Sequence, residues 1–170
     1  MWRAGIHWDK LAWYAEEKAR RGAFATLLAV DFSATSPSDS SSWNAVALGD
    51  SCLFHVRQNT LLRSFPLLRA DEFGTTPSLI STNLNYSERS LDSLTIAAGE
   101  CHSGDLILMS TDALAAWLLS ENERGSDYWK SLSCVTQDEF SSLVKRARDS
   151  GEMRNDDVTL AVVECCKSCQ

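Results

Sequence analysis

The sequence predicts an α+β protein, on three observations. Short apolar runs, of which Leu106 to Met109 is the clearest, indicate buried strands. Longer stretches with apolar residues at every third or fourth position indicate amphipathic helices. Because strands and helices mix without strict alternation, an α+β sandwich is favoured over a doubly wound parallel sheet.

The N-terminal part of the chain begins with a predicted helix. Apolar residues recur at helical spacing from Trp8 to Ala19, charged residues fill the opposite face, and Gly22 ends the helix. The apolar segment 23–32 follows as a predicted buried strand. The serine-rich segment 35–42 is then expected to be a surface loop, too short to separate two domains.

Two predicted strands flank a short acidic turn. They run from Trp43 to Leu48 and from Cys52 to Arg57. In the second strand apolar residues alternate with others, which is typical of a half-buried strand and places His55 on its polar side. A further short strand is expected over 61–68, and the polar stretch 81–93 shows no readable pattern.

The last part of the chain contains the clearest helix. Thr136 and Glu139 form a capping-box pattern ahead of an apolar stripe, which predicts the start of a helix that Gly151 ends. The other elements expected here are a strand over 106–109, a helix over 112–119 and a final strand over 158–163.

The composition is that of a globular domain. The 170 residues are 44% hydrophobic and 23% charged, which suits one domain with a core of useful size. The net charge of −7 disfavours nonspecific binding to nucleic acid. Because no apolar run approaches the ~20 residues of a membrane span and the N-terminus lacks a secretory signal, we expect a cytoplasmic protein without a membrane segment.

The six cysteines agree with that expectation. Cys52, Cys101 and Cys134 adjoin apolar residues, and we expect them to be buried free thiols. Residues 165–170 form a cysteine-rich tail with one C-x-x-C. Half a zinc site or a redox pair is the alternative to free thiols there.

Three aspartates beside apolar strands are the candidate metal ligands. Asp50 and Asp112 each follow a predicted strand, and Asp156 precedes the last one. Carboxylates brought together by a sheet can hold hard divalent cations. Local explanations also exist, because Asp112 suits a helix N-cap and Asp50 suits a tight turn. Asp156 and Asp157 suit a solvated turn, although a bound cation would relieve their mutual repulsion.

Taken together, the three segments resemble the metal-dependent protein phosphatase family, type 2C. The matching text is A-x-A-x-G-D-S over Ala45 to Ser51, G-D-x-x-x-x-x-T-D-A-L over Gly104 to Leu114, and D-D-x-T-L-x-V-V over Asp156 to Val163. The likeness keeps the family's order from about Gly22 to Glu164. It implies part of an α-β-β-α sandwich with mainly antiparallel sheets flanked by helices, with residues 1–164 as a single partial domain.

The resemblance also implies roles for the three aspartates. Asp112 matches a metal ligand in the family's Ser/Thr-Asp-Gly segment, and Asp156 matches a ligand near the last strand. Asp50 matches an aspartate linked in some members to an accessory metal. The implied chemistry is hydrolysis of phosphoserine and phosphothreonine by a water activated between two Mn²⁺ or Mg²⁺ ions, which requires no catalytic side chain.

Some features of the family are missing from the sequence. It has no Asp-Gly dipeptide, Ala113 stands where Gly is usual, and Ala116 stands where many members have another acidic residue. The first half of the family domain, which supplies further metal ligands, has no counterpart. We therefore expect the C-terminal portion of such a domain, with an incomplete metal site, because two carboxylates alone hold these ions poorly.

Two functions follow as alternatives. One is a serine/threonine phosphatase that acts on a phosphoprotein, for instance the substrate of a Ser/Thr kinase. The other is a catalytically silent remnant that serves as a binding or regulatory module. Trp8, Trp13 and Trp117 are expected either in the core or on surface left bare by the missing half, where association with another protein is then expected.

Overall fold

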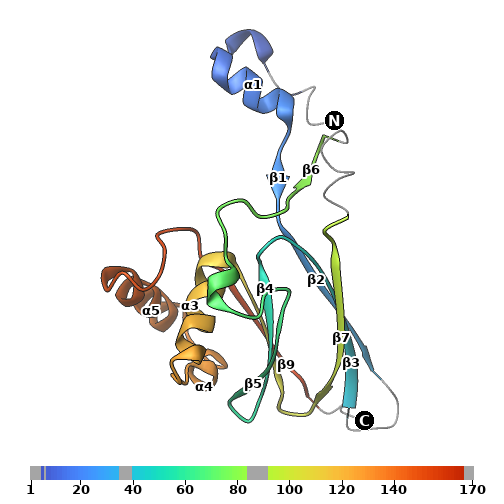
Figure 1. Cartoon of the computed structure of the whole chain (residues 1–170), viewed down its shortest axis with the longest axis vertical. Coiled ribbons are helices and arrows are strands. Elements are labelled where there is room, and N and C mark those ends of the chain that lie inside the picture. The colour runs from blue at the N-terminus through green and yellow to red at the C-terminus, as the bar shows by residue number, and fades with distance from the viewer. Residues whose placement is uncertain (1–4, 6, 35–39, 84–91, 167–170) are drawn as a thin grey trace.

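The described part of the chain forms three stacked layers (Figure 1). The computed structural model describes residues 5, 7–34, 40–83 and 92–166. Helices cover one face of a four-stranded sheet, and the other face of that sheet packs against a three-stranded sheet. The predicted α+β class is confirmed. Among the described residues no helix covers the outer face of the three-stranded sheet, so three of the four expected layers are accounted for.

Both sheets are antiparallel throughout. The four-stranded sheet has the order β5 (Thr60–Phe65), β4 (Cys52–Arg57), β8 (Leu106–Ser110) and β9 (Leu160–Glu164). The three-stranded sheet has the order β2 (Leu27–Ala34), β3 (Ser40–Leu48) and β7 (Thr95–His102). The helical layer consists of α3 (Asp112–Glu123), α4 (Trp129–Leu132) and α5 (Gln137–Asp149).

Strand β4 is buried on both faces. Its residues Cys52, Phe54 and Val56 pack against the helices, whereas Leu53 packs against the three-stranded sheet. His55 lies on that second face and is also buried. The prediction of a half-buried strand with His55 on its polar side is wrong, because a second sheet covers the face that the alternation left polar.

The N-terminal segment stands apart from these layers (Figure 1). Helix α1 (Trp13–Arg21) follows a short 3-10 turn, η2 (Trp8–Lys10), and neither buries a residue. The predicted single helix over 8–19 is therefore two pieces. Strand β1 (Phe24–Ala25) then pairs with β6 (Ile80–Ser81), which splits the predicted strand 23–32 into β1 and β2.

Most of the other predicted elements are present with shifted ends. β4 has its predicted bounds, and Thr136 and Glu139 form the capping box at the start of α5. The sequence patterns do not predict β7, α4 or the 3-10 turn η3 (Ala70–Glu72). Within the predicted loop 35–42, residues 40–42 belong to β3 and 35–39 lie outside the described residues. Residues 84–91 of the unreadable stretch lie outside them as well.

The cysteine and tryptophan predictions are partly confirmed. Cys52 and Cys101 are buried free thiols, but Cys134 is exposed because it lies in the turn between α4 and α5. Trp117 is in the core and Trp13 is bare, so both settings expected for the tryptophans occur. Residues 167–170 of the tail lie outside the described residues. None of the described helices has the length and apolar character to cross a membrane.

Candidate metal centre

The sheet register brings the three acidic segments to one end of the four-stranded sheet. Cys52 at the start of β4 pairs with Ser110 at the end of β8. Asp50 and Asp112 each lie two residues beyond this pair. The end of β8 also pairs with the start of β9, which brings the Asp156 segment to the same end. Three segments that are far apart in the sequence thus converge.

Asp50 is a buried carboxylate beside Asp112, with only 8% of its surface exposed. Burial raises the pKa of Asp50, and the negative charge of Asp112 raises it further. Its own backbone hydrogen bond and the nearby Arg154 act in the opposite direction. Two neighbouring carboxylates repel each other unless a proton or a cation compensates their charge. The negative charge of Asp112 therefore adds to the cost of ionising Asp50.

Asp112 is not the cap of α3. The N-cap residue is Thr111, and it makes no side-chain capping bond. Its Oγ1 instead donates to the carbonyl of Asp157 at 3.1 Å and accepts from the backbone N of Thr159 at 3.0 Å. The capping explanation of Asp112 is therefore wrong. Asp112 lies in the first turn of α3, where the helix dipole favours a negative charge.

Asp156 does not join Asp50 and Asp112. Its side chain is exposed, and Oδ1 accepts from the backbone N of Asp157 at 2.8 Å. Its carbonyl accepts a hydrogen bond from the guanidinium of Arg148. These local bonds are those of a solvated turn, one of the alternatives that the sequence leaves open. Within the described residues, no group of three or more Asp, Glu, His or Cys is arranged to hold a metal ion.

The sequence patterns do not predict that Glu72 and Arg154 lie near Asp50, because neither residue adjoins an apolar strand run. Asp50 and Glu72 of η3 both line a cavity of about 230 Å³. The Glu72 carboxylate accepts from the backbone N of Leu68 at 2.7 Å, so it is engaged with its own loop. Arg154 reaches the same loop and donates to the carbonyl of Phe73 at 3.3 Å. The site therefore has a cationic side chain beside its acidic pair.

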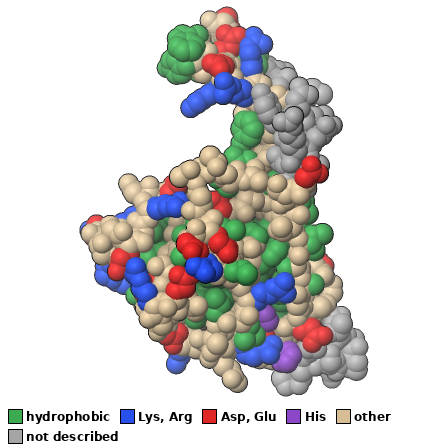
Figure 2. Space-filling model, viewed as in Figure 1, with side chains coloured by type: hydrophobic (Ala, Val, Ile, Leu, Met, Phe, Trp, Pro, Cys, Tyr) green, Lys and Arg blue, Asp and Glu red, His purple; other side chains and the backbone are tan. Residues whose placement is uncertain are grey.

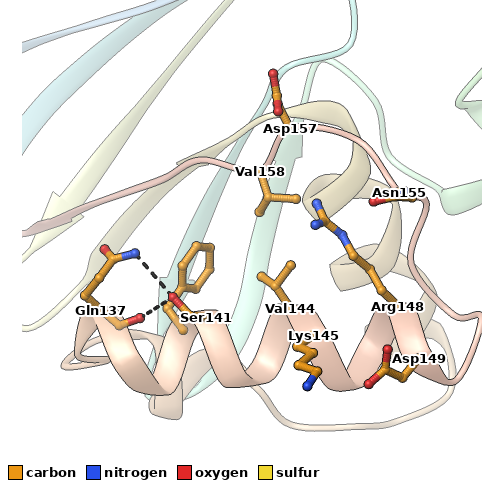
Figure 3. A pocket seen from close by; sticks show the side chains of 10 residues that line it. Gln137, Ser141, Val144, Lys145, Arg148, Asp149, Asn155, Asp157 and Val158 are labelled. Carbon is orange, nitrogen blue, oxygen red and sulfur yellow. Dashed lines mark hydrogen bonds between the residues drawn. The ribbon is translucent and has the colours of Figure 1, made fainter.

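A larger cavity of about 640 Å³ lies between α5 and the segment 155–158 (Figure 3). Val144 and Val158 point toward one another across it, and Arg148 rises from α5 beside them. The Arg148 Nε is buried and has no hydrogen-bond partner among the described residues. The lining of this cavity is mostly polar, with Phe140, Val144 and Val158 as its apolar part, and it adjoins the Asp156 turn.

A second buried carboxylate, Asp105, lies at the opposite end of β8 and is 1% exposed. Arg57 donates to both of its oxygens at 2.8 Å, and the backbone N of His102 donates to Oδ2 at 2.8 Å. His55 Nε2 lies 2.8 Å from the same oxygen. Burial would raise the pKa of Asp105, but these hydrogen bonds hold it well below its usual range. The cluster ties β4 to the turn between β7 and β8 and leaves no oxygen for a metal.

Among solved structures, the chain is similar to two phosphatases. The photosystem II phosphatase PBCP is 12% identical with a TM-score of 0.46, and the match covers 76% of this chain and 65% of PBCP. The phosphatase domain of the cell fate determinant SpoIIE from Bacillus subtilis, presoaked with Mn, is 15% identical with a TM-score of 0.47. That match covers 99% of this chain and 71% of the domain. The chain thus spans less than two thirds of PBCP.

No protein-family model and no curated protein sequence matches the chain. The structural likenesses are too distant to assign it to a family.

Proposed function

We propose that this chain binds one divalent cation, Mg²⁺ or Mn²⁺, between Asp50 and Asp112 as part of an incomplete type 2C-like phosphatase site. The observation that carries the proposal is the buried Asp50 beside Asp112, at matching positions of two paired strands. Carboxylate oxygens are the ligands that both ions prefer. Burial and, after it, repulsion by Asp112 raise the pKa of Asp50, and a bound cation would favour the ionised carboxylate against both.

The described donors do not make up the two-ion centre that the resemblance implies, so the proposal is for one cation. Asp156 uses a carboxylate oxygen within its own turn, and Glu72 binds its own loop. A bound Mg²⁺ or Mn²⁺ would supply Lewis acidity toward a phosphoryl oxygen. In this proposal, hydrolysis of phosphoserine or phosphothreonine needs acidic ligands from outside the described residues, and the chain by itself is catalytically silent.

The proposed partner of the site is a phosphoprotein, such as the substrate of a Ser/Thr kinase. Its chain would lie in the cavity between α5 and segment 155–158, whose lining includes the cationic side chains of Lys145 and Arg148, which suit a carbonyl or a carboxylate. A cytoplasmic location belongs to the same proposal, because buried cysteines that stay free suit a reducing compartment.

A different observation supports the second candidate function, a binding or regulatory module. The outer face of the three-stranded sheet exposes Ile96, and α1 buries none of its residues. Neither feature touches the candidate metal centre. The chain can therefore serve as a module whether or not a cation binds.

Titration of the folded chain with Mn²⁺ tests the metal proposal. Calorimetry measures the heat of binding, and electron paramagnetic resonance measures the loss of the free Mn²⁺ signal. With so few ligands we expect a Kd on the order of 0.1–1 mM, the range of weak cation sites. Asp50→Asn and Asp112→Asn should each weaken binding by about tenfold or more, whereas the control Asp138→Asn, an exposed carboxylate in the first turn of α5, should not. A folded wild-type chain that binds no Mn²⁺ would contradict the proposal.

An assay with p-nitrophenyl phosphate and excess Mn²⁺ tests the claim that the site is incomplete. We expect no more turnover by the wild-type chain than by Asp112→Asn. Mn²⁺-dependent turnover that disappears in both site variants would show instead that the centre is complete, and the claim of a silent chain would then be wrong.

A further inference from the structure

Helix α1 lacks, among the described residues, the packing contacts that normally stabilise so short a helix. It has nine residues and buries none of them. Isolated helices shorter than about 12–15 residues are marginal in water, and most helical stability comes from packing. Trp13 is 77% exposed, and Tyr14 beside it is also exposed. Figure 2 shows apolar side chains standing out from this segment at the top of the molecule. Such a helix would be stabilised by packing its apolar residues against another surface.

The described part of the same chain does not supply that surface. Only two residues separate α1 from β1, and β1 is paired with β6. At Gly22, φ is +95° and an added Cβ would lie 2.7 Å from Thr82 Oγ1, so this corner is tight. The backbone N of Ala23 also donates to Thr82 Oγ1 at 2.9 Å. The link is anchored on both sides and directs α1 away from the sheets (Figure 1).

The three-stranded sheet has an apolar outer face without a helix on it. Its register places Ala29, Val46 and Ile96 in one row across β2, β3 and β7. Ile96 is 76% exposed, and Ala29 is exposed as well. Leu27 and Leu48 form the neighbouring row, but Leu48 is only 1% exposed, so the exposed apolar surface of this face lies at Ala29 and Ile96. A sheet face of this kind is normally covered by another layer.

The charges of the helix and the sheet face are complementary. The last turn of α1 carries Lys18, Arg20 and Arg21. Arg20 and Arg21 pair with Glu16 and Glu17 of the same helix, so the helix keeps one net positive charge. The outer face carries Asp31 on β2 and Glu100 on β7, beyond the apolar row. No Lys or Arg lies among the described residues of that face. A basic helix end thus finds acidic residues next to an apolar row.

We propose that the chain forms a symmetric dimer in which α1 of each copy packs on the outer face of the other copy's three-stranded sheet. The same two surfaces then meet twice about a two-fold axis, which closes the assembly. Trp13 covers the row that contains Ile96, and the basic last turn lies near Asp31 and Glu100. The arrangement buries both apolar surfaces and provides the missing helical layer. It involves neither Asp50 nor Asp112.

Sedimentation velocity over a concentration series tests this dimer. The wild-type chain should be dimeric, whereas Trp13→Glu and Ile96→Glu should each weaken dimerisation by about tenfold or more, as expected for a central apolar contact. The control Leu68→Glu places the same charge on another exposed apolar residue, in the loop after β5, and should leave the dimer intact. A wild-type chain that stays monomeric at all concentrations would overturn the proposal.

Mixing the two variants tests the reciprocal contact directly. In a mixed dimer the intact helix of the Ile96→Glu copy meets the intact sheet of the Trp13→Glu copy, so association should partly return. If Trp13→Glu dissociates the dimer but Ile96→Glu does not, the helices contact each other and the proposed interface is wrong. Should Ile96→Glu fail to fold by circular dichroism, Glu100→Lys takes its place, and an unweakened dimer in that variant contradicts the charge argument.

Discussion

Replacing Asp105 by Asn should destabilise the fold strongly, because this buried carboxylate accepts hydrogen bonds from three residues. Hydrogen bonds to charged groups contribute about 1.5–3 kcal/mol each. Arg57 is one-third exposed, so its share is reduced by solvent screening, whereas His55 is almost fully buried. Asn keeps one acceptor oxygen but turns an amide toward donors. We therefore expect a loss of about 3 kcal/mol, the lower end of the range for breaking a buried ion pair.

Urea unfolding followed by tryptophan fluorescence measures this loss. With a slope of about 2 kcal/mol per molar urea, the midpoint should fall by about 1.5 M. The control Asp71→Asn removes a carboxylate from an exposed pair with Arg69 and should leave the midpoint unchanged. If Asp105→Asn lowers the free energy of unfolding by less than about 1 kcal/mol, with the slope unchanged, Asp105 is not the centre of a stabilising cluster.

The pH dependence of the same variant gives an independent check. The pKa of Asp105 is lower in the folded state than in the unfolded state, so the ionised carboxylate stabilises the fold above the unfolded pKa of about 3.9. That contribution is lost as the pH falls from there toward the folded pKa. The wild-type chain should therefore lose stability steeply below about pH 4, and Asp105→Asn should show a flatter decline.

Two further predictions concern the sheet and the metal site. Gly99→Ala should destabilise the fold by about 1–3 kcal/mol, because its Cβ would lie 2.6 Å from the buried ring of Trp43. The control Gly74→Ala should not, because the nearest atom to its Cβ is 4.0 Å away. Urea unfolding compares the two variants, and equal stability would contradict the close packing at Gly99. Asp50→Asn should stabilise the metal-free chain at neutral pH while it weakens Mn²⁺ binding. The pKa of Asp50 is raised on folding, so the ionised carboxylate destabilises the fold above that pKa, and this destabilisation disappears as the pH falls through it. Thermal unfolding of the wild-type chain and the variant between pH 4 and 7 measures the difference. A variant less stable than the wild-type chain at pH 7 would contradict the prediction.

The meeting of Asp50 and Asp112 could be predicted from the sequence, because both lie at the ends of short apolar strands. Once β4 and β8 pair in antiparallel register, their flanking residues must share one end of the sheet. Asp156 follows the same logic for its backbone but not for its side chain. Whether an exposed aspartate binds a metal or its own turn depends on local hydrogen bonds that no spacing pattern reveals.

The Asp105 cluster could not be predicted, for a different reason. The alternation in β4 describes one apolar face and says nothing about what covers the other. His55 is buried because the three-stranded sheet lies over it, and one of the strands of that sheet, β7, gives no clear signal. Gly99 and Glu100 interrupt β7, yet Gly99 is what allows the Trp43 ring to lie against the strand. Tertiary packing here overrides local preference.

The proposed metal site and the sheet face that no described helix covers share one physical property. Asp50 is a carboxylate buried beside another carboxylate, and the row containing Ile96 is apolar surface left in water. Each arrangement destabilises the isolated chain. Proteins retain such unfavourable arrangements mostly at functional sites, where a ligand or a partner can offset the cost. The cost at Asp50 is relieved by positive charge, whereas the cost at Ile96 is relieved by an apolar surface. A cation acts at the first site and an apolar surface at the second, and the residues of the two do not touch. Mn²⁺ should therefore leave the dimer unchanged, and Ile96→Glu should leave Mn²⁺ affinity unchanged. The two proposals can thus be tested separately.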